Sequence, residues 1–353
     1  MTSLSILPHI SRFTGMHLSF VALISSLILS TSVLTAPLQK RDDPLVGYLA
    51  THFISNDEAI YQHISNGNNP LSFSALNGGN AVLRSTVGTE GARDPYLVSS
   101  PDNSNYWTIG TDLQIGKTNW GEAVRHGSRS IVVWHSTDLV NWGTNYLVEV
   151  EDPTAGMVWA PSAIYDESSQ KYHVFWASQL FASDDPNHDG NPVTEHVIRT
   201  ASTTDFKTFT NPETYLQTPG YAVIDQEFQK IDGEDNSFAR FIKNETNSRV
   251  YQEISTDGIF GTWTRIGGAE GYVTDQGREG PASFRDNQDS SKYHLWLDNY
   301  GYQGGGRYEP YSTSNIKQGG YTADSMDLFP TNLRHGSVIP VTQSQYDALR
   351  AKI

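Results

Sequence analysis

The stretch STDLVNW, residues 136–142, reads as a turn between two strands, and altered copies of it recur along the chain. Residues 203–209 repeat it as TTDFKTF, and residues 255–258 begin STDG and lead to Trp263. Two looser copies are ISNG at residues 64–67, leading to Phe73, and TSN at residues 313–315, leading to Tyr321. In each copy Asp or Asn caps a turn, and an aromatic side chain then returns to the core. The turns fall roughly every 50 to 70 residues, a period typical of a repeat fold.

The segments between these turns favour strands. They are short runs rich in β-branched and aromatic side chains, such as YWTIGTDL, SIVVWHS, YHVFWAS and YHLWLDNY. Helical periodicity is confined to the C-terminus, where Thr342 and Gln345 predict a capping box. Five units of this kind predict an all-β fold, a five-bladed β-propeller whose ring is closed by strands from both chain ends. Unrelated hairpin turns in a β-sandwich are the alternative.

A second series of residues lies between the turns, and its members share a place just before a short apolar run. The spacings between them are 65, 66, 54 and 56 residues. In a propeller the innermost strand of each blade lines the central axis, so one side chain per blade can point toward that axis. The five side chains are chemically reactive or aromatic rather than aliphatic, which suits chemistry better than packing. They are Asp94, Trp159, Asp225, Glu279 and His335.

The N-terminal residues predict export from the cell. Residues 18–36 form an apolar run with small residues near its end, followed by the dibasic pair Lys40-Arg41, which is typical of a signal peptide and a short pro-segment over residues 1–41. We therefore expect a secreted, extracellular protein whose residues 42–353 form a single catalytic propeller domain, without a membrane in its mature form. An N-terminal membrane anchor is the alternative.

Composition excludes several classes of partner. The chain has a net charge of −15, and residues 1–41 carry three basic and no acidic groups, so the remainder is more acidic still. This argues against nucleic acid and anionic membranes as partners. The chain has no cysteine, so its stability must come from a large core and not from disulfides. Asn244 begins Asn-Glu-Thr, which predicts a glycosylation site.

The order and spacing of several stretches resemble glycoside hydrolase family 43, and most closely its α-L-arabinofuranosidase-like subgroup. The resemblance covers nearly all of residues 42–353. It implies a five-bladed propeller that acts on arabinose- and xylose-containing polysaccharides of the plant cell wall. The stretches that carry it are YLATHF, AVLRSTVGTEGARDPYLV, GSRSIVVWHSTDLVNW, VWAPSAIYDE, YHVFWAS, VIDQEF, REGP and LRHGSVIPVTQSQYDAL.

The resemblance implies three catalytic carboxyl groups. Asp94 in GARDPYL would be the general base, Glu279 in REGP the general acid, and Asp225 in VIDQEF the group that orients the acid and tunes its pKa. This division fits glycosidic bond cleavage, because one carboxyl must protonate the leaving oxygen while an ionised one activates water on the opposite face. A neighbouring carboxylate and burial would hold the acid protonated near its working pH.

Other positions are expected to contact sugar. By resemblance, Trp159 in VWAP forms a wall that faces substrate, and His335 in RHGS meets water or a calcium ion at the central axis. Ser162 stands where relatives often carry an acidic residue, so sugar contacts there would differ. His52, Phe53 and Arg334 are placed to line the site if the chain ends close the ring; a structural histidine is the alternative for His335.

The sequence leads to few expectations about a cofactor or a partner. No cofactor is required, a structural calcium ion is an option, and the protein is expected to be a monomer that acts on plant cell-wall polysaccharide or oligosaccharide. β-Xylosidase and endo-arabinanase remain alternatives within the family, since sequence does not show loop shape. A non-catalytic carbohydrate-binding propeller is a further alternative. The retaining fructan hydrolases share Arg-Asp-Pro, but their Asn-Asp-Pro motif is missing here.

Overall fold

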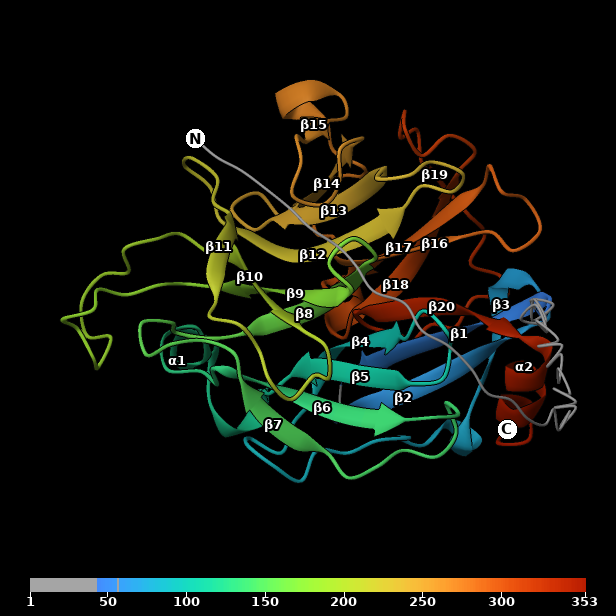
Figure 1. The fold of residues 1–353 in the computed structure, drawn as a ribbon, viewed down its shortest axis with the longest axis horizontal. Coiled ribbons are helices and arrows are strands. Elements are labelled where there is room, and N and C mark those ends of the chain that lie inside the picture. The colour runs from blue at the N-terminus through green and yellow to red at the C-terminus, as the bar shows by residue number, and fades with distance from the viewer. Residues whose placement is uncertain (1–42, 56) are drawn as a thin grey trace, which may run out of the picture. The chain divides into compact units, whose positions relative to one another are not determined.

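A computed structural model describes residues 43–55 and 57–353, which form five four-stranded antiparallel sheets (Figure 1). The prediction of an all-β, five-bladed propeller is therefore confirmed. The predicted signal peptide and pro-segment, residues 1–41, lie outside the described residues. Within the part described, no helix is both long and apolar enough to cross a membrane.

Each blade is named here by its innermost strand. The β4 blade contains β4 (Arg93–Ser99), β5 (Tyr106–Thr111), β6 (Ser130–Ser136) and β7 (Tyr146–Glu149). The β8 blade contains β8 (Trp159–Asp166), β9 (Lys171–Ser178), β10 (Val197–Thr203) and β11 (Glu213–Leu216). The β12 blade contains β12 (Val223–Lys230), β13 (Phe238–Asn244), β14 (Arg249–Ser255) and β15 (Thr264–Arg265). The β16 blade contains β16 (Glu279–Arg285), β17 (Tyr293–Asn299), β18 (Arg307–Thr313) and β19 (Thr322–Ala323). The closing β20 blade contains β20 (Gly336–Thr342), β1 (Leu45–Ile54), β2 (Asp57–Asn66) and β3 (Asn69–Ala75).

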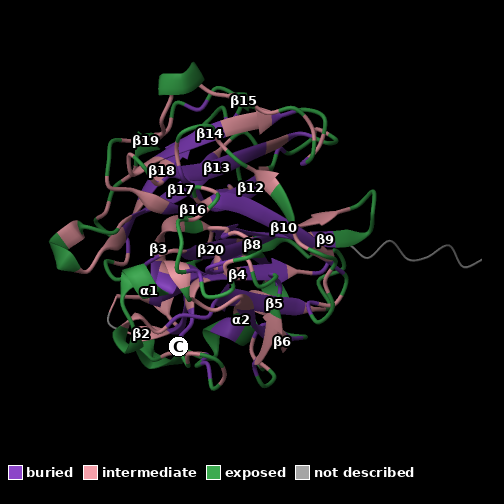
Figure 2. Ribbon diagram, turned by 90° about the vertical axis from the view of Figure 1, so that its left-hand side faces the viewer, coloured by how far each residue is buried: buried purple, intermediate pink, exposed green. Residues whose placement is uncertain are grey.

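The ring is closed by strands from both ends of the described chain, as predicted. The last strand, β20, pairs antiparallel with the first, β1, along a register that runs from Leu45 opposite Thr342 to His52 opposite Gly336. The innermost strands then contact one another in order around the axis, β4 with β8, β12, β16, β20 and β4 again. These strands are largely buried (Figure 2).

The repeated turns all connect the third and fourth strands of a blade. The Ser136 and Thr203 hydroxyls accept backbone N–H groups of the following turn, including those of Asp138 and Asp205. Asp138 Oδ1 in turn accepts the N–H of Val140, and the Asp205 carboxylate accepts in the same way. Ser255 and Thr313 accept turn N–H groups in the same way, so four blades share one hydrogen-bonded turn. In the β20 blade the Ser65 hydroxyl instead donates to the Gly67 carbonyl.

Helices are few and short in the described residues. α2 (Gln343–Arg350) follows β20, and the Thr342 N–H donates to Gln345 Oε1 at 2.8 Å, so the predicted capping box is confirmed. The six-residue α1 (Trp120–Arg125) was not predicted, because its stability comes from an Asn119 cap and tertiary contacts rather than from periodicity. Four 3-10 helices complete the elements: Asn77–Gly79, Ile115–Lys117, Gly268–Glu270 and Tyr302–Gly304.

Four of the inner strands begin with the same irregularity. A register shift interrupts each pairing near the start of the strand. A residue with a left-handed φ lies at this shift, second in β4, β8 and β16 and third in β12. A bulge of this kind re-aims side chains and is common beside active sites. The left-handed residues are Asp94 (φ 49°), Ala160 (φ 47°), Asp225 (φ 53°) and Gly280 (φ 53°).

Candidate active site

The bulges place two side chains of each inner strand at one end of the ring. The first position holds Arg93, Trp159, Ile224 and Glu279, and the second holds Asp94, Ala160, Asp225 and Gly280. The predicted series mixed these two positions. Its carboxylates are nevertheless brought to the same end, because β4, β12 and β16 all begin there.

His335 joins the carboxylates of two blades. Its Nδ1 lies 3.5 Å from Asp94 Oδ1 and 3.9 Å from Asp225 Oδ2. Burial alone would lower the pKa of this imidazole, but the charges of Asp225, Asp94 and Glu279 outweigh it and raise the pKa to about 9. At neutral pH the ring is therefore a cation held between carboxylates. Its position also depends on Gly280, since a Cβ there would sit 2.5 Å from His335 Cγ.

Asp94 is held in its ionised form. Burial opposes ionisation, but the contact with His335 outweighs burial and lowers the pKa of Asp94, with help from the charge of Arg93. The Thr111 hydroxyl also donates to Asp94 Oδ2 at 3.0 Å. An ionised carboxylate in a partly buried site can accept a proton from water.

Asp225 has the opposite tendency. It is 6% exposed, and burial raises its pKa to about 7, with the charge of Glu279 adding to the rise. Its Oδ2 accepts the N–H of Gly280 at 3.0 Å, which joins β12 to β16 directly beside Glu279. The pKa values of Asp94 and Asp225 are thus shifted in opposite directions, although both carboxyls lie within 4 Å of the same imidazole nitrogen.

Glu279 is contacted by two cations that sequence reasoning missed or placed otherwise. Lys243 Nζ donates to Glu279 Oε2 at 2.7 Å, and an Arg334 Nη lies 3.6 Å from Oε1. Lys243 is nearly buried on β13, and the charges of Glu279, Asp225 and Glu245 raise its pKa although burial opposes this. Both contacts fix the direction of the Glu279 carboxylate.

Arg334 was predicted to bind sugar, but it is buried and already bonded. Its Nε donates to both oxygens of Asp298, which has no exposed surface, at 2.9 and 2.6 Å. It also donates to Ser55 Oγ and to the carbonyl oxygen of Gly305. Arg334 is therefore better described as a residue that positions Glu279.

The aromatic wall lies at the start of β8. Trp159 is partly exposed and meets Trp120 of α1 edge to face, with ring centroids 5.9 Å apart. Trp120 is 53% exposed, so this wall extends outward from the carboxylates. Ser162, predicted to contact sugar, is 4% exposed, which argues against a direct sugar contact at this position.

His52 and Phe53 were also expected to line the site, but both are 1% exposed. His52 Nε2 bonds His63 Nδ1 at 2.8 Å, and burial holds its pKa well below the usual range. The Phe53 ring lies under the guanidinium groups of Arg93 and Arg334, at 4.4 and 5.2 Å. Phe53 therefore supports two arginines of the site instead of contacting substrate.

The predicted glycosylation site fits the structure poorly. Asn244 is 5% exposed and its Nδ2 donates to Tyr272 Oη at 3.4 Å. A glycan on this nitrogen would have no room without local rearrangement.

Direct calcium binding by His335 also fits poorly. Calcium prefers oxygen ligands, whereas this ring nitrogen faces carboxylates as a cation. Within residues 43–55 and 57–353, no group of three or more His, Asp or Glu could hold a metal ion. A calcium ion that meets His335 through water stays a prediction.

Stability should fall as the pH rises from 5 to 9. The folded pKa of His335 is raised to about 9, so its contribution is complete below about pH 6.5 and is lost as the pH passes 9. The raised pKa of Asp225, about 7, adds a cost between about pH 4 and 7. The His335 part alone amounts to about 3 kcal/mol. Urea unfolding at pH 5, 7 and 9 measures the slope, which His335→Gln should flatten between pH 7 and 9; an unchanged slope in that variant would contradict the assignment.

Comparison with known proteins agrees with this geometry. The family described as "Probable glycosyl hydrolase domain", of the group related to glycosyl hydrolase family 43, matches residues 43–347. An alpha-L-arabinofuranosidase of Bifidobacterium longum is 32% identical over 242 residues, which are 65% of this chain. The chain spans only 22% of the length of that relative.

Solved structures show a looser likeness. A thermostable family-43 glycoside hydrolase matches with a TM-score of 0.49 and 16% identity, over 75% of this chain and 88% of its own. The catalytic domain of a GH62 alpha-L-arabinofuranosidase from Coprinopsis cinerea matches with a TM-score of 0.47 and 13% identity, over 69% and 70% of the two chains. The fold assignment rests on this chain's own five sheets, and the family on the match across residues 43–347. The chain therefore belongs to the family of probable glycosyl hydrolase domains related to glycoside hydrolase family 43.

Proposed function

We propose that the protein is a secreted, inverting glycoside hydrolase that releases α-L-arabinofuranosyl units from plant cell-wall arabinan, arabinoxylan or arabinogalactan, acting as a monomer. The observation that carries the proposal is the meeting of three carboxyl groups from three blades. Asp94 and Asp225 both face His335, and Asp225 accepts the N–H that follows Glu279. Family membership and the arabinofuranosidase relative support the reaction class.

In this proposal Asp94 is the general base. Its lowered pKa keeps it ionised, and Thr111 and His335 fix its orientation. A water molecule between Asp94 and the sugar would lose its proton to this carboxylate as it attacks the anomeric carbon. Inversion requires this attack from the face opposite the leaving oxygen, which suits a base and an acid on different blades.

Glu279 is assigned the role of general acid, with Asp225 as its partner. Two carboxyls in one site repel when both are ionised, and the charge of Glu279 adds to the larger effect of burial in raising the pKa of Asp225. In this proposal Glu279 gives its carboxyl proton to the leaving oxygen and becomes a carboxylate. Lys243 and Arg334 fix the orientation of the Glu279 side chain, and their positive charges stabilise the carboxylate that forms when Glu279 has donated its proton.

A proton NMR time course on short α-1,5-arabino-oligosaccharides tests the proposal. We expect single arabinose to appear first as the β-anomer and only later to equilibrate with the α-anomer. First appearance of the α-anomer would overturn the inverting mechanism. Shorter oligosaccharides without early arabinose would replace exo action with endo-arabinanase action.

Two other functions have distinct results in the same experiment. Xylo-oligosaccharides run in parallel would reveal a β-xylosidase by release of xylose in place of arabinose. Binding of oligosaccharide without any product, by a protein that remains folded, would indicate a carbohydrate-binding propeller.

A further inference from the structure

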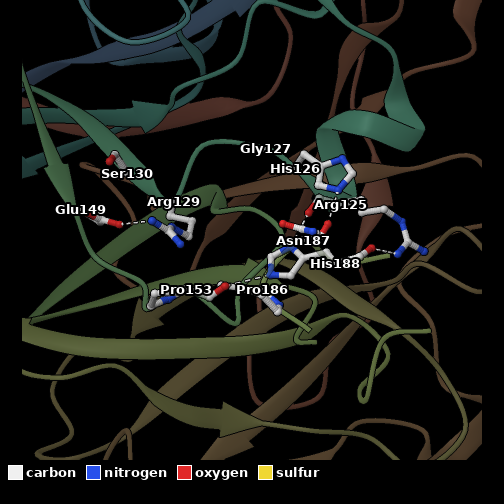
Figure 3. A pocket seen from close by; sticks show the side chains of 11 residues that line it. Arg125, His126, Gly127, Arg129, Ser130, Glu149, Pro153, Pro186, Asn187 and His188 are labelled. Carbon is white, nitrogen blue, oxygen red and sulfur yellow. Dashed lines mark hydrogen bonds and ion pairs between the residues drawn. The ribbon is translucent and has the colours of Figure 1, made fainter. Parts of the chain in front are cut away.

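A second charged region lies on the same face of the propeller as the carboxylates. It is a cavity of about 550 Å³ between the β4 and β8 blades (Figure 3). Strand β6 begins at Ser130 and β7 ends at Glu149, both at the end of the blade where Asp94 lies. Both residues line the cavity, with Arg125, His126, Arg129 and His188.

The cavity lining carries two guanidinium groups and one carboxylate. The Arg125 guanidinium donates to the carbonyl oxygens of His188 and Gly190, so neutral acceptors hold its charge. Arg129 donates to Glu149 at 2.7 Å, and this carboxylate is the acidic group among the lining residues. Arg125 is thus a guanidinium that no lining carboxylate neutralises, which favours an anionic ligand over a cationic one in a chain with a net charge of −15.

Two histidines also line the cavity. His126 lies with Nδ1 at 2.8 Å from a Glu122 carboxylate oxygen and Nε2 at 2.9 Å from the Asn187 carbonyl, and the Glu122 contact raises its pKa. His188 is 6% exposed, and its nitrogens face the carbonyl oxygens of Arg125 and Pro153 at 2.7 and 2.8 Å.

Helix α1 connects the cavity to the aromatic wall. Exposed Trp120 is its first residue and meets Trp159, whereas Arg125 is its last residue and lines the cavity. The two ends are about 7.5 Å apart along the helix axis. A sugar chain that rests on the tryptophans is therefore within reach of the cations.

We propose that this cavity is an outer subsite that binds the carboxylate of a uronic acid unit in the polysaccharide carrying the released sugar. The inference rests on the proposed function for the nature of the polymer. Its volume lies within the range of about 300–1,000 Å³ usual for small-ligand sites. Guanidinium groups bind carboxylates through paired hydrogen bonds, which gives the subsite its preference for acidic over neutral sugars.

Direct binding tests the subsite without any catalysis. Isothermal titration of the full chain with a galacturonate trimer is compared with the methyl-esterified trimer, which has the same size and no charge. We expect the acid to bind at least tenfold more tightly than the ester. Equal binding of the two, or equally tight binding of inorganic phosphate, would overturn the proposal.

Matched variants locate the binding. The double variant His126→Gln, Arg129→Gln should weaken binding of the acidic trimer about tenfold. Arg285→Gln is the control. Arg285 is 32% exposed and paired with Asp232, much as Arg129 is 34% exposed and paired with Glu149. Arg285 is the last residue of β16 and therefore lies on the opposite face of the propeller. Equal affinity of the double variant and the control would overturn the location.

Failure of this inference can be told from failure of the proposed function. Binding of the acidic trimer at the cavity without release of arabinose would support the subsite and contradict the proposed function. Release of arabinose together with equal binding of the acidic and the esterified trimer would support the proposed function and contradict the subsite. If both the function and the subsite are correct, kcat/KM can be compared on two substrates, a uronate-bearing arabinosylated polymer and a neutral arabino-oligosaccharide. The double variant should lower the ratio of the first kcat/KM to the second about tenfold.

Discussion

Glu279→Gln should lower kcat/KM on arabino-oligosaccharides by about 10²–10⁴-fold, the range that general acid catalysis contributes. The amide has the size of the carboxyl and can still meet Arg334 and Lys243, so the protein should remain folded. The loss should shrink to about tenfold or less on 4-nitrophenyl α-L-arabinofuranoside, because an activated leaving group needs little protonation. Steady-state kinetics on the two substrates give both numbers.

Two variants make this result decisive. Asp94→Asn should lose activity to a similar extent on both substrates, since both need an activated water. Asp225→Asn is informative because burial raises the pKa of Asp225 to about 7 and its Oδ2 accepts the Gly280 N–H directly beside Glu279. If Asp225→Asn shows the dependence on leaving group and Glu279→Gln does not, the two roles are exchanged.

Arg334→Met should reduce the free energy of unfolding by about 3–5 kcal/mol, since it leaves a buried charge without its partner. That charge is Asp298, whose side chain has no exposed surface. Activity should fall as well, because the substitution also removes the contact between Arg334 and Glu279. Urea unfolding and kinetics at a temperature well below the transition measure the two effects.

Arg199→Met is the matched control for this prediction. Arg199 and Glu151 are 8% and 0% exposed, against 9% and 0% for Arg334 and Asp298, and Arg199 lies on β10, away from the carboxylates. Both variants should lose similar stability, but only Arg334→Met should lose activity while folded. Full activity in Arg334→Met would contradict its role in positioning Glu279.

The architecture could be predicted because the turn that marks each blade is formed by residues close together in the sequence and is repeated along the chain. Each blade uses a turn such as that at Asp138 or Asp205, where short polar side chains bond nearby backbone groups, so a few residues suffice to reveal it. The closure of the ring followed from counting units. Helix α1 was missed because six residues are too few to show a helical period.

The site was predicted in part, and the misses have a physical cause. Asp94, Asp225 and Glu279 stand beside Pro or at strand starts, where sequence patterns are visible. The sequence spacing treated these three residues as the same position of their strands. Asp94 and Asp225 in fact stand one position after the one that Glu279 occupies, because spacing alone does not reveal the bulge.

Lys243 and Asp298 were missed because they lie on second strands of their blades. Lys243 is opposite Ile224 and Asp298 is opposite Glu279 across the sheet. A charged residue near the end of each strand, Lys243 in ARFIKNE and Asp298 in YHLWLDNY, was the available signal. His52 and Phe53 were placed at the correct end of the ring, but burial depth depends on packing from the neighbouring blade.

The pairing of β20 with β1 also sets an order of events during synthesis. Arg334 and His335 immediately precede β20 and are translated after the rest of the carboxylate cluster. A nascent chain still awaiting these residues on the ribosome holds Asp94 and Asp225 without the imidazole between them. In the proposed mechanism the site is therefore complete only after residue 335 has been translated and the ring is shut. A chain truncated by premature termination before residue 334 would carry the three carboxyl groups without Arg334 and His335.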